Sequence, residues 1–364
     1  MLIVNNMVME GEVAHTIQVY QMLTAFAKTG SSTTYVWPCF HNRPGMLDKL
    51  KLPITRVPIF CRFSSGIPRQ LELMARFFVW VRKFPQPTAI FTRNIGLAFT
   101  AQFVAPRVGL EIHMDFNTRV HHLIPLLGNR VSFVCISEVL ANNLVNKYGV
   151  DRKRILVAHD GVEYNHFAQA SPLPLEKLES TLSTTFSDPA KIRHLYIGKM
   201  EHKRGLGMIA AAAQALPSHQ FVLIGGTLTE VHAARQMGLD RPNVVILPAI
   251  PHAQVPQLLK AFNSLLMPYL DLPENHWRSP MKLFEYMASG IPIITTKVGG
   301  VSEVLSDKEA FMADPNDTNG LIAPLESLVN NPSLGQKKAQ QAQILAETSY
   351  TWSARAKAIR NFLS

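Results

Sequence analysis

The sequence predicts an α/β protein with two doubly wound domains, each built on a parallel sheet. Its 364 residues are 47% hydrophobic and 17% charged, so the chain can form two cores and does not have the composition of a disordered or coiled-coil protein. Strand-like apolar runs alternate with segments of helical length, which is typical of βαβ units. The alternation pauses over residues 168–192, where prolines and Ser/Thr residues indicate a connection between the domains.

Five predicted strands lie in the first half of the chain. Each is a short apolar run, and each is followed by a segment long enough for a helix. They cover residues 1–4, 34–37, 89–91, 109–113 and 132–136. Because the chain starts with one of these strands, we expect no signal peptide.

The second half resumes the same alternation. Its predicted strands cover residues 195–198, 220–226, 243–247, 264–267 and 291–296. A terminal helix is expected after Tyr350, with Trp352 as its apolar anchor. Doubly wound sheets bind ligands at the carboxyl ends of their strands, so the segments that follow the strands are the candidate site.

The segment before the last of these strands has the pattern of an anion-binding helix. Ser279 predicts the N-cap, and Pro280 fits the first helical position. The amides of Met281 and Lys282 then lack helical partners, and a helix start with free amides and a positive dipole end binds phosphate. Lys282 adds a charge there, and Glu285, one turn later, can accept hydrogen bonds from the hydroxyls of a ribose. An ordinary capped amphipathic helix also fits these residues.

A basic loop follows the predicted strand at 195–198. Gly198 indicates a turn, and Lys199 and Arg204 place two cations shortly before the next helix. Two such side chains suit the leaving diphosphate of a nucleotide donor. The alternative for this loop is a pair of solvated cations without a function.

These motifs resemble those of the retaining GT-B glycosyltransferases, in particular glycosyltransferase family 4. The family's second glutamate, with the hydrophobic, Met or Ala, small and Gly residues near it, is matched by residues 285–290. Its glycine and its two cations are matched by Gly198, Lys199 and Arg204, with the identities of the cations exchanged. Residues 160–167 resemble the segment that closes the family's first domain.

The chain departs from the family pattern at one position. Trp277 stands where the family has its first acidic residue, which contacts the donor sugar. Glu274 lies in the same loop, as do Asn275 and His276, and is a candidate to replace that contact. The effect of Trp277 on sugar recognition stays open at the level of the sequence.

The resemblance implies a GT-B fold, with two Rossmann-like doubly wound domains facing a central cleft. It implies an N-terminal acceptor-binding domain over residues 1–170 and a C-terminal nucleotide-sugar-binding domain over residues 171–350. A terminal helix over residues 351–364 is expected to cross back to the N-terminal domain. The implied co-substrate is a nucleoside diphosphate sugar. Because no Asp-x-Asp motif occurs, a metal bound by that motif is not needed. We expect no cofactor beside the nucleotide-sugar co-substrate.

The resemblance also assigns roles to residues. The catalytic residues are His113, which would lie near the reacting sugar, together with Lys199 and Arg204 on the diphosphate. Apart from the resemblance, Glu12 and His15, which follow the first strand, are candidates for the acceptor side. The donor-binding residues are Gly11, Gly198, Glu274, Ser279, Met281, Lys282 and Glu285.

The net charge of +10 is concentrated in residues 1–170, which hold 18 Lys and Arg against 10 Asp and Glu. No zinc finger, RNA-binding aromatic signature or clustered basic run occurs, so nucleic acid is not an expected partner. The predicted helix at residues 68–83 carries apolar residues flanked by Arg and Lys. It fits contact with an anionic membrane, and it fits a core helix with cations at its edge as well.

The three cysteines, Cys39, Cys61 and Cys135, show no metal-ligand spacing and lie in apolar sequence, so reduced thiols are expected. No apolar run reaches the roughly 18 residues of a membrane span. We therefore expect a cytoplasmic protein, with the inner face of the membrane as an alternative place.

The sequence thus predicts a retaining glycosyltransferase that moves a sugar from a nucleoside diphosphate sugar to an acceptor hydroxyl, in polysaccharide or glycolipid synthesis. Two other functions stay open. An inverting GT-B enzyme needs a general base, for which His15 and Asp115 are candidates. A non-catalytic nucleotide-sugar-binding protein is suggested by Trp277. The donor's base and sugar, the acceptor, the linkage and the oligomeric state lie beyond the sequence.

Overall fold

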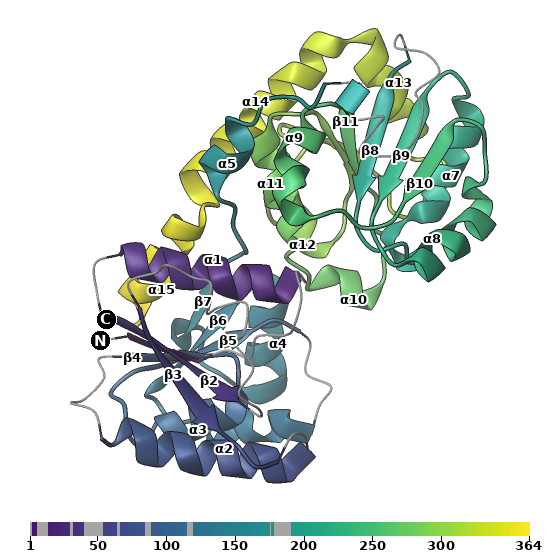
Figure 1. Ribbon diagram of the computed structural model, residues 1–364. Coiled ribbons are helices and arrows are strands. Elements are labelled where there is room, and N and C mark those ends of the chain that lie inside the picture. Colours follow the sequence, from purple (N-terminus) through teal and green to yellow (C-terminus); the bar gives the residue numbers. More distant parts are fainter. Residues whose placement is uncertain are drawn as a thin grey trace. The chain divides into compact units, whose positions relative to one another are not determined.

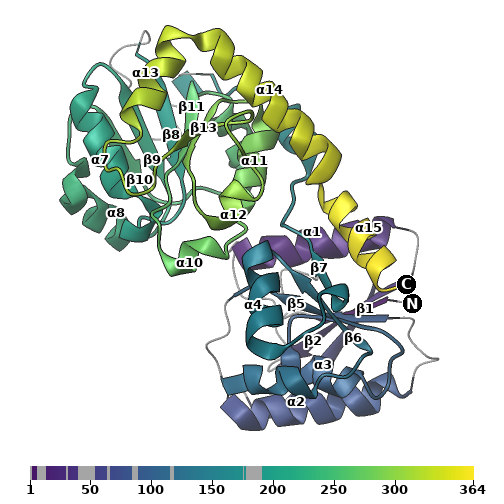
Figure 2. The same ribbon diagram turned by 180° about the vertical axis from the view of Figure 1, so that it is seen from behind.

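The computed structural model describes residues 2–5, 14–29, 32–39, 54–63, 66–83, 89–114, 119–174, 176–177 and 191–364. The chain forms two compact units, residues 1–160 with 352–364 and residues 161–351. Each unit is a parallel sheet with helices packed against it (Figures 1 and 2). Within the described ranges, no helix has both the length and the apolar character that crossing a membrane requires.

The first unit contains a seven-stranded parallel sheet in the order β3-β2-β1-β4-β5-β6-β7. The sheet is wound in two directions from β1, because Leu2 pairs with Thr33 on one side and with Ala89 on the other. The strands are β1 (Leu2–Asn5), β2 (Thr33–Cys39), β3 (Thr55–Phe60), β4 (Ala89–Thr92), β5 (Val108–Ile112), β6 (Val131–Cys135) and β7 (Ile155–Val157). The helices are α1 (Ala14–Lys28), α2 (Gly66–Val81), α3 (Ile95–Ala101), η2 (Arg119–Leu126), α4 (Glu138–Tyr148), η3 (Arg152–Arg154) and α15 (Trp352–Phe362).

Helices cover both faces of this sheet. Helices α1 and α15 lie on one face, and α2 and α3 on the other (Figure 1). Every residue of β4 and β5 is buried, as a strand between two helical layers requires. The last helix, α15, brings Trp352 and Ile359 into this unit, where they are 3% and 0% exposed.

The second unit contains a six-stranded parallel sheet in the order β10-β9-β8-β11-β12-β13, and its chain order starts at the central strand β8. The strands are β8 (Arg193–Ile197), β9 (Gln220–Ile224), β10 (Val244–Leu247), β11 (Ser264–Met267), β12 (Ile293–Thr296) and β13 (Phe311–Ala313). The helices are α5 (Tyr164–Ala168), η4 (His202–Arg204), α7 (Leu206–Ala215), α8 (Leu228–Ala234), η5 (Arg235–Leu239), η6 (His252–Gln254), α9 (Val255–Leu259), α10 (Pro273–His276), α11 (Met281–Ser289), α12 (Gly299–Ser302), α13 (Ile322–Asn330) and α14 (Pro332–Ser349).

Two apolar layers form the core of the second unit. One contains side chains from α5, α9, α11 and α14, including Leu258 and Phe284. The other contains side chains from α7, α8 and α13, including Ile209 and Leu325. The sheet is therefore covered on both faces, and its loops are held by helices on each side.

The boundary between the units lies at Asp160, ahead of the expected residue 170. The reason is α5, because its Phe167 packs in the core of the second unit. The expected connection over residues 168–192 is likewise not where the chain passes between units. It passes at residues 160–161 and again at 351–352, and Leu173 already donates a backbone hydrogen bond within the second unit.

Candidate functional site

The candidate site of the second unit lies where the order of the sheet reverses, between β8 and β11. The loop after β8 contains Gly198 and η4, and the loop after β11 begins with Pro268. Gly205 has a φ of +74°, and a Cβ there would lie 1.5 Å from the carbonyl oxygen of Pro268. Only glycine fits this contact, so Gly205 holds the basic loop against the loop after β11.

Lys282, in the first turn of α11, reaches into this switch point. Its Nζ donates to the carbonyl oxygen of Ile197 at 3.0 Å and lies 4.3 Å from the centre of the Tyr196 ring. A Cβ on Gly198 would lie 3.1 Å from that Nζ, so the glycine leaves room for it. Burial, and then the charge of Arg204, hold the pKa of Lys282 well below its usual value. The ammonium therefore occupies a place where a bound anion would stabilise it.

Arg204 lies beside Lys282 and is fixed by two contacts. Its Nη1 donates to the Tyr269 hydroxyl at 2.9 Å, and its Nε donates to Glu201 Oε2 at 3.2 Å. Lys203 Nζ lies 3.7 Å from the same carboxylate oxygen. Burial raises the pKa of Glu201, but the charges of Arg204, Lys203 and Lys199 outweigh it and lower that pKa. The Glu201 carboxylate is thus shared by Arg204 and Lys203, and together with Lys199 these cations leave the loop with a net positive charge.

The start of α11 differs from the expected one by one residue. Pro280 is the N-cap, and the helix begins at Met281, so Ser279 lies one residue ahead of the cap. Pro280 has an extended ψ of 120°. The first hydrogen bond of the helix start runs from the Leu283 amide to the Pro280 carbonyl oxygen, at 2.9 Å. The amides of Met281 and Lys282 precede that bond and point out of the helix start, as an anion site needs.

Glu285 has a partner that the sequence did not indicate. The residue is 8% exposed, and its Oε1 lies 2.7 Å from Nε2 of His252, the first residue of η6. Its other oxygen forms no hydrogen bond within the described part of the chain. A ribose bound by Glu285 would therefore share the carboxylate with His252.

Lys199 and Glu274 stand apart from this group. Lys199 is exposed, and its side chain forms no hydrogen bond or ion pair with any described residue. Only its carbonyl oxygen takes part, accepting from the Tyr196 hydroxyl at 2.7 Å. Glu274 lies in α10, and its backbone carbonyl accepts from Arg278 Nε at 2.8 Å. The structure thus brings together Gly198, Arg204 and Lys282, and it adds the unpredicted Tyr196 and Tyr269.

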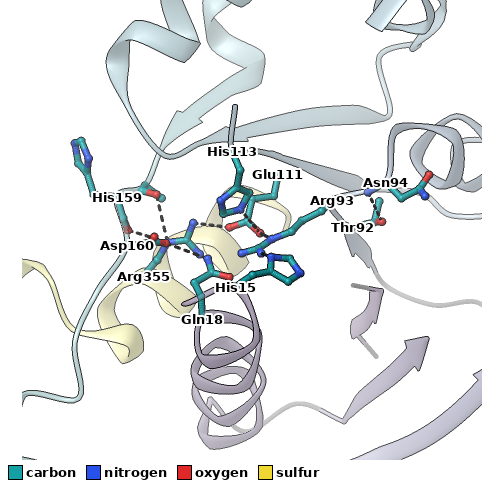
Figure 3. A network of polar contacts seen from close by, with 11 residues as sticks. His15, Gln18, Thr92, Arg93, Asn94, Glu111, His113, His159, Asp160 and Arg355 are labelled. Carbon is teal, nitrogen blue, oxygen red and sulfur yellow. Dashed lines mark hydrogen bonds and ion pairs between the residues drawn. The ribbon is translucent and has the colours of Figure 1, made fainter. Parts of the chain in front are cut away.

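In the first unit, a polar network surrounds Glu111 on β5 (Figure 3). Arg93 Nε donates to Glu111 Oε2 at 2.7 Å, and Arg355 Nη2 donates to Oε1 at 2.5 Å. Burial raises the pKa of Glu111, but the neighbouring Arg93, His113 and Arg355 outweigh it and hold that pKa well below its usual value. Arg355 Nε also donates to the carbonyl of His159 at 2.8 Å. The ionised Glu111 therefore fixes Arg93, which directly follows β4, and Arg355 of α15.

His15 and His113 both belong to this network. His113 Nε2 lies 3.0 Å from Glu111 Oε2, without the alignment of a hydrogen bond. Burial, and then Arg93, lower the pKa of His113 below its usual value, so its imidazole is neutral near pH 7. His15 Nδ1 lies 2.8 Å from Arg93 Nη1. A guanidinium only donates, so His15 accepts at Nδ1 and carries its proton on Nε2.

The two arginines of this network were not predicted. The signal that could have indicated them is Glu111 itself, because a carboxylate inside an apolar strand needs a cationic partner. Its partners lie far away in the sequence, so the sequence does not identify them. Gly11, Glu12 and Asp115 lie outside the described residues.

Known glycosyltransferases resemble this chain in sequence. Residues 191–331 match the family model described as "Glycosyl transferases group 1". The putative teichuronic acid biosynthesis glycosyltransferase TuaH of Bacillus subtilis is 27% identical over 173 residues, which cover 48% of this chain and 42% of that protein. One component of human phosphatidylinositol N-acetylglucosaminyltransferase is 23% identical over 358 residues, which cover 92% and 69%. The chain spans about half the length of the first curated relatives it matches.

Solved structures of glycosyltransferases share the fold over the whole chain. A glycosyltransferase from Rickettsia africae has a TM-score of 0.79 at 14% identity, covering 100% of this chain and 97% of that one. Anabaena HepE in complex with UDP and glucose has a TM-score of 0.75 at 17% identity, covering 100% and 98%. The chain therefore has the GT-B fold of these proteins, and residues 191–331 carry a glycosyl transferases group 1 domain.

Proposed function

We propose that this protein is a glycosyltransferase that moves a sugar from a nucleoside diphosphate sugar to an acceptor hydroxyl. One observation carries the proposal: Arg204, Lys282, Glu285 and the free amides of α11 gather at the switch point of a group 1 domain. Cations and amides suit a diphosphate, and the adjacent carboxylate suits a ribose. The complexes of HepE with UDP and with UDP-glucose support this class of donor.

The leaving diphosphate would be stabilised by groups of the second unit. Negative charge develops on the bridging oxygen as the bond to the sugar breaks, and positioned cations and amides lower the energy of that state. Arg204 is already oriented by Tyr269 and Glu201, so little reorganisation is needed. The proposed chemistry uses protein cations and no metal or other cofactor.

We further propose that the transfer proceeds with retention, as in glycosyltransferase family 4. In that mechanism the leaving phosphate takes the acceptor's proton, so no protein base is needed. The neutral imidazole of His113 suits hydrogen bonding to a sugar hydroxyl, and its environment beside Arg93 disfavours a charged form. His113 is therefore proposed to orient the donor sugar.

The inverting alternative needs a general base, and His15 is poorly suited to that role. Its Nδ1 lone pair faces Arg93 Nη1 at 2.8 Å, which leaves a protonated Nε2. The anomeric configuration of the product separates the two mechanisms, because retention keeps and inversion reverses that of the donor. An inverted product, measured by NMR, would overturn the proposal of retention.

A thermal-shift screen of UDP, GDP, ADP and their common sugar conjugates tests the donor class. A ligand that binds only the folded protein raises the midpoint of unfolding. We expect one nucleotide series to raise it, and Glu285→Gln to remove the rise. The matched control is Glu326→Gln, which changes an exposed carboxylate on α13 and should keep the rise. Binding without turnover across a broad set of acceptors would favour a non-catalytic protein.

The acceptor is proposed to be a growing polysaccharide or a glycolipid, handled in the cytoplasm at the inner face of the membrane. The names of relatives support this class, since they include a teichuronic acid biosynthesis enzyme and a component of phosphatidylinositol N-acetylglucosaminyltransferase.

A face of α2 supports peripheral contact with an anionic membrane. Ile67, Leu71 and Val79 are 72%, 60% and 56% exposed and recur at helical spacing. The buried stripe of the same helix, Leu73 and Phe77, points the other way. The exposed cations along this segment are Arg62, Arg76, Arg82 and Lys83. Apolar side chains with cations beside them suit the surface of anionic lipid.

Co-sedimentation with vesicles tests this contact. We expect the protein to sediment with phosphatidylglycerol-containing vesicles and less with pure phosphatidylcholine. The double variant Ile67→Ser, Leu71→Ser should lose binding, whereas Leu228→Ser should keep it, because Leu228 is 75% exposed but lies on α8 of the second unit. Equal sedimentation of both variants would argue against α2 as the contact.

A further inference from the structure

Arg278 is a cation of the second unit that has no role in the donor site described so far. It follows α10, in the loop where the family's first acidic residue is replaced by Trp277. The guanidinium is half-buried, and its Nε donates to the carbonyl of Glu274 at 2.8 Å. Its Cζ lies 5.4 Å from the centre of the Trp277 ring. Within the described residues, its two Nη groups have no hydrogen bond or ion pair, so four N–H donors are available.

The loop that carries Arg278 is held in place from two sides. Asn275 is 2% exposed, and its Nδ2 donates at 2.9 Å to the carbonyl of Lys203, directly before Arg204. On the other side, a Cβ on Gly300 would lie 2.0 Å from the carbonyl oxygen of Arg278. These backbone contacts fix Arg278 beside the basic loop and do not depend on its side chain.

Arg204 and Lys282 meet at Tyr269, and the loop of Arg278 is anchored beside them. Arg204 donates to the Tyr269 hydroxyl, and Lys282 Nζ lies 5.2 Å from the centre of the Tyr269 ring. Burial and then the charge of Arg204 lower the pKa of Arg278, as a second guanidinium in the same part of the unit would. The carboxylate of Glu201 pairs with Arg204 and Lys203 and, among the described residues, forms no ion pair with Arg278. Like charges gathered in this way are stabilised by an anion.

We propose that Arg278 binds the diphosphate of the nucleotide donor, as a third cation beside Arg204 and Lys282. The inference rests on the proposed function, since it assigns one more residue to the same donor site. A guanidinium with both Nη groups available can hold two phosphate oxygens at once. Trp277 thus stands in the family's acidic position, and the next residue, Arg278, brings a positive charge to the donor site.

Calorimetric titration of the full chain with UDP, GDP and ADP, and with the matching monophosphates, tests the proposal. We expect Arg278→Gln to weaken binding of the preferred diphosphate by about tenfold or more and to change monophosphate binding by less than about threefold. Arg278→Lys keeps a charge without the fork and should lose less. The control is Arg241→Gln, whose Nε also donates to a backbone carbonyl, that of Gly238 at 2.9 Å, and it should bind like the unaltered protein.

The outcomes separate this inference from the proposed function. If the unaltered protein binds UDP, GDP or ADP and Arg278→Gln binds it equally well, the role of Arg278 is wrong and the proposed function stands. If none of the three binds, both are overturned. A loss confined to UDP-glucuronate, with UDP and UDP-glucose unaffected, would place Arg278 on a sugar carboxylate and overturn the diphosphate role. The unfolding midpoints of Arg278→Gln and Arg278→Lys are measured as well, and values equal to that of Arg241→Gln show that these variants are folded.

Discussion

At the scale of single residues, Lys282 holds a charge in surroundings that disfavour it. Burial and the neighbouring Arg204 lower its pKa, and its Nζ has one carbonyl partner. A diphosphate brings negative charge and returns the pKa towards its usual value. The residue is therefore prepared for an anion and poorly stabilised without one.

This environment predicts proton uptake when a nucleoside diphosphate binds. Because the pKa of Lys282 is low in the free protein and higher in the complex, affinity should fall as the pH rises through the free-state pKa. Calorimetry of UDP binding in buffers with different ionisation enthalpies measures the protons taken up. Lys282→Met should weaken binding and abolish the uptake, and an uptake that is unchanged in this variant would assign it to another group.

A second residue-scale effect concerns stability in acid. His194 is fully buried, with Nδ1 2.8 Å from Ser264 Oγ and Nε2 2.9 Å from His219 Nδ1. Burial and the charge of His219 lower the pKa of His194 to about 3. The native protein therefore holds this imidazole neutral, whereas the unfolded chain protonates it near its ordinary pKa of about 6.5.

The free energy of unfolding should consequently fall as the pH drops from about 6.5 towards 3, because the unfolded state binds more protons in that window. His194 contributes up to about 1.4 kcal/mol per pH unit there. Urea unfolding between pH 7.5 and 4 measures the slope. His194→Gln removes the titrating group, so it should be less stable at pH 7.5 and show a flatter slope. Parallel slopes for both proteins would contradict this assignment.

At the scale of elements, the loops of the site depend on glycines with different surroundings. Gly205 ends η4 at φ +74° against the backbone of Pro268, whereas Gly149 ends α4 at φ +65° with open space around it. Both conformations disfavour an L side chain, but only Gly205 also has no room for one.

The two positions form a matched pair. We expect Gly149→Ala to lower the free energy of unfolding by about 1 kcal/mol, the cost of a left-handed alanine. Gly205→Ala should lower it by more, because the loop must also move away from Pro268, and it should weaken nucleotide binding as Arg204 shifts. Urea unfolding with a UDP titration measures both quantities. A similar loss of unfolding free energy in the two variants would show that the loop moves away from Pro268 at little cost.

The strands that the alternation did not single out are β3, β7 and β13, and all three lie at an edge of a sheet. Strands β7 and β13 have three residues each, and β3 contains Pro58, which lacks an amide hydrogen for a ladder. An edge strand is less buried than a central one and needs fewer apolar residues, so its hydrophobic pattern in the sequence is weak.

At the scale of the whole molecule, the last helix completes a unit that begins at the other end of the chain. Helix α15 contributes buried Trp352 and Ile359 to the first unit, and its Arg355 pairs with Glu111. Without α15, the buried Glu111 carboxylate would lose Arg355 and keep Arg93 as its arginine partner. A buried carboxylate that loses a cationic partner destabilises the fold.

Deletion of residues 352–364 should therefore destabilise the first unit selectively. Hydrogen exchange read by mass spectrometry should show lost protection in α1, β4 and β5, with β8, β9 and β11 still protected, because the second unit has its own core. Lys357→Ala, an exposed change on α15, serves as the control and should leave both units protected. Unchanged protection of β5 in the truncated protein would refute this dependence.

The sequence by itself indicated the α/β class, the central strands and two local pairs, Gly198 with Arg204 in the loop after β8 and Lys282 with Glu285 on α11. These features are encoded within single strand–loop–helix units, where spacing along the chain fixes neighbours in space. Lys199 and the cap at Ser279 were predicted from the same local patterns. In the structure the Lys199 side chain is exposed and the N-cap is Pro280, because side-chain rotamers and the exact helix start depend on packing.

Only the tertiary structure decided which side chains meet across the fold. Arg204 with Tyr269, Glu285 with His252, and Glu111 with Arg355 join residues 65, 33 and 244 positions apart. No sequence pattern links them, because each contact follows from the order of strands in a sheet and from helices packing on its faces. The boundary at Asp160 has the same cause, since Phe167 belongs to the core that buries it.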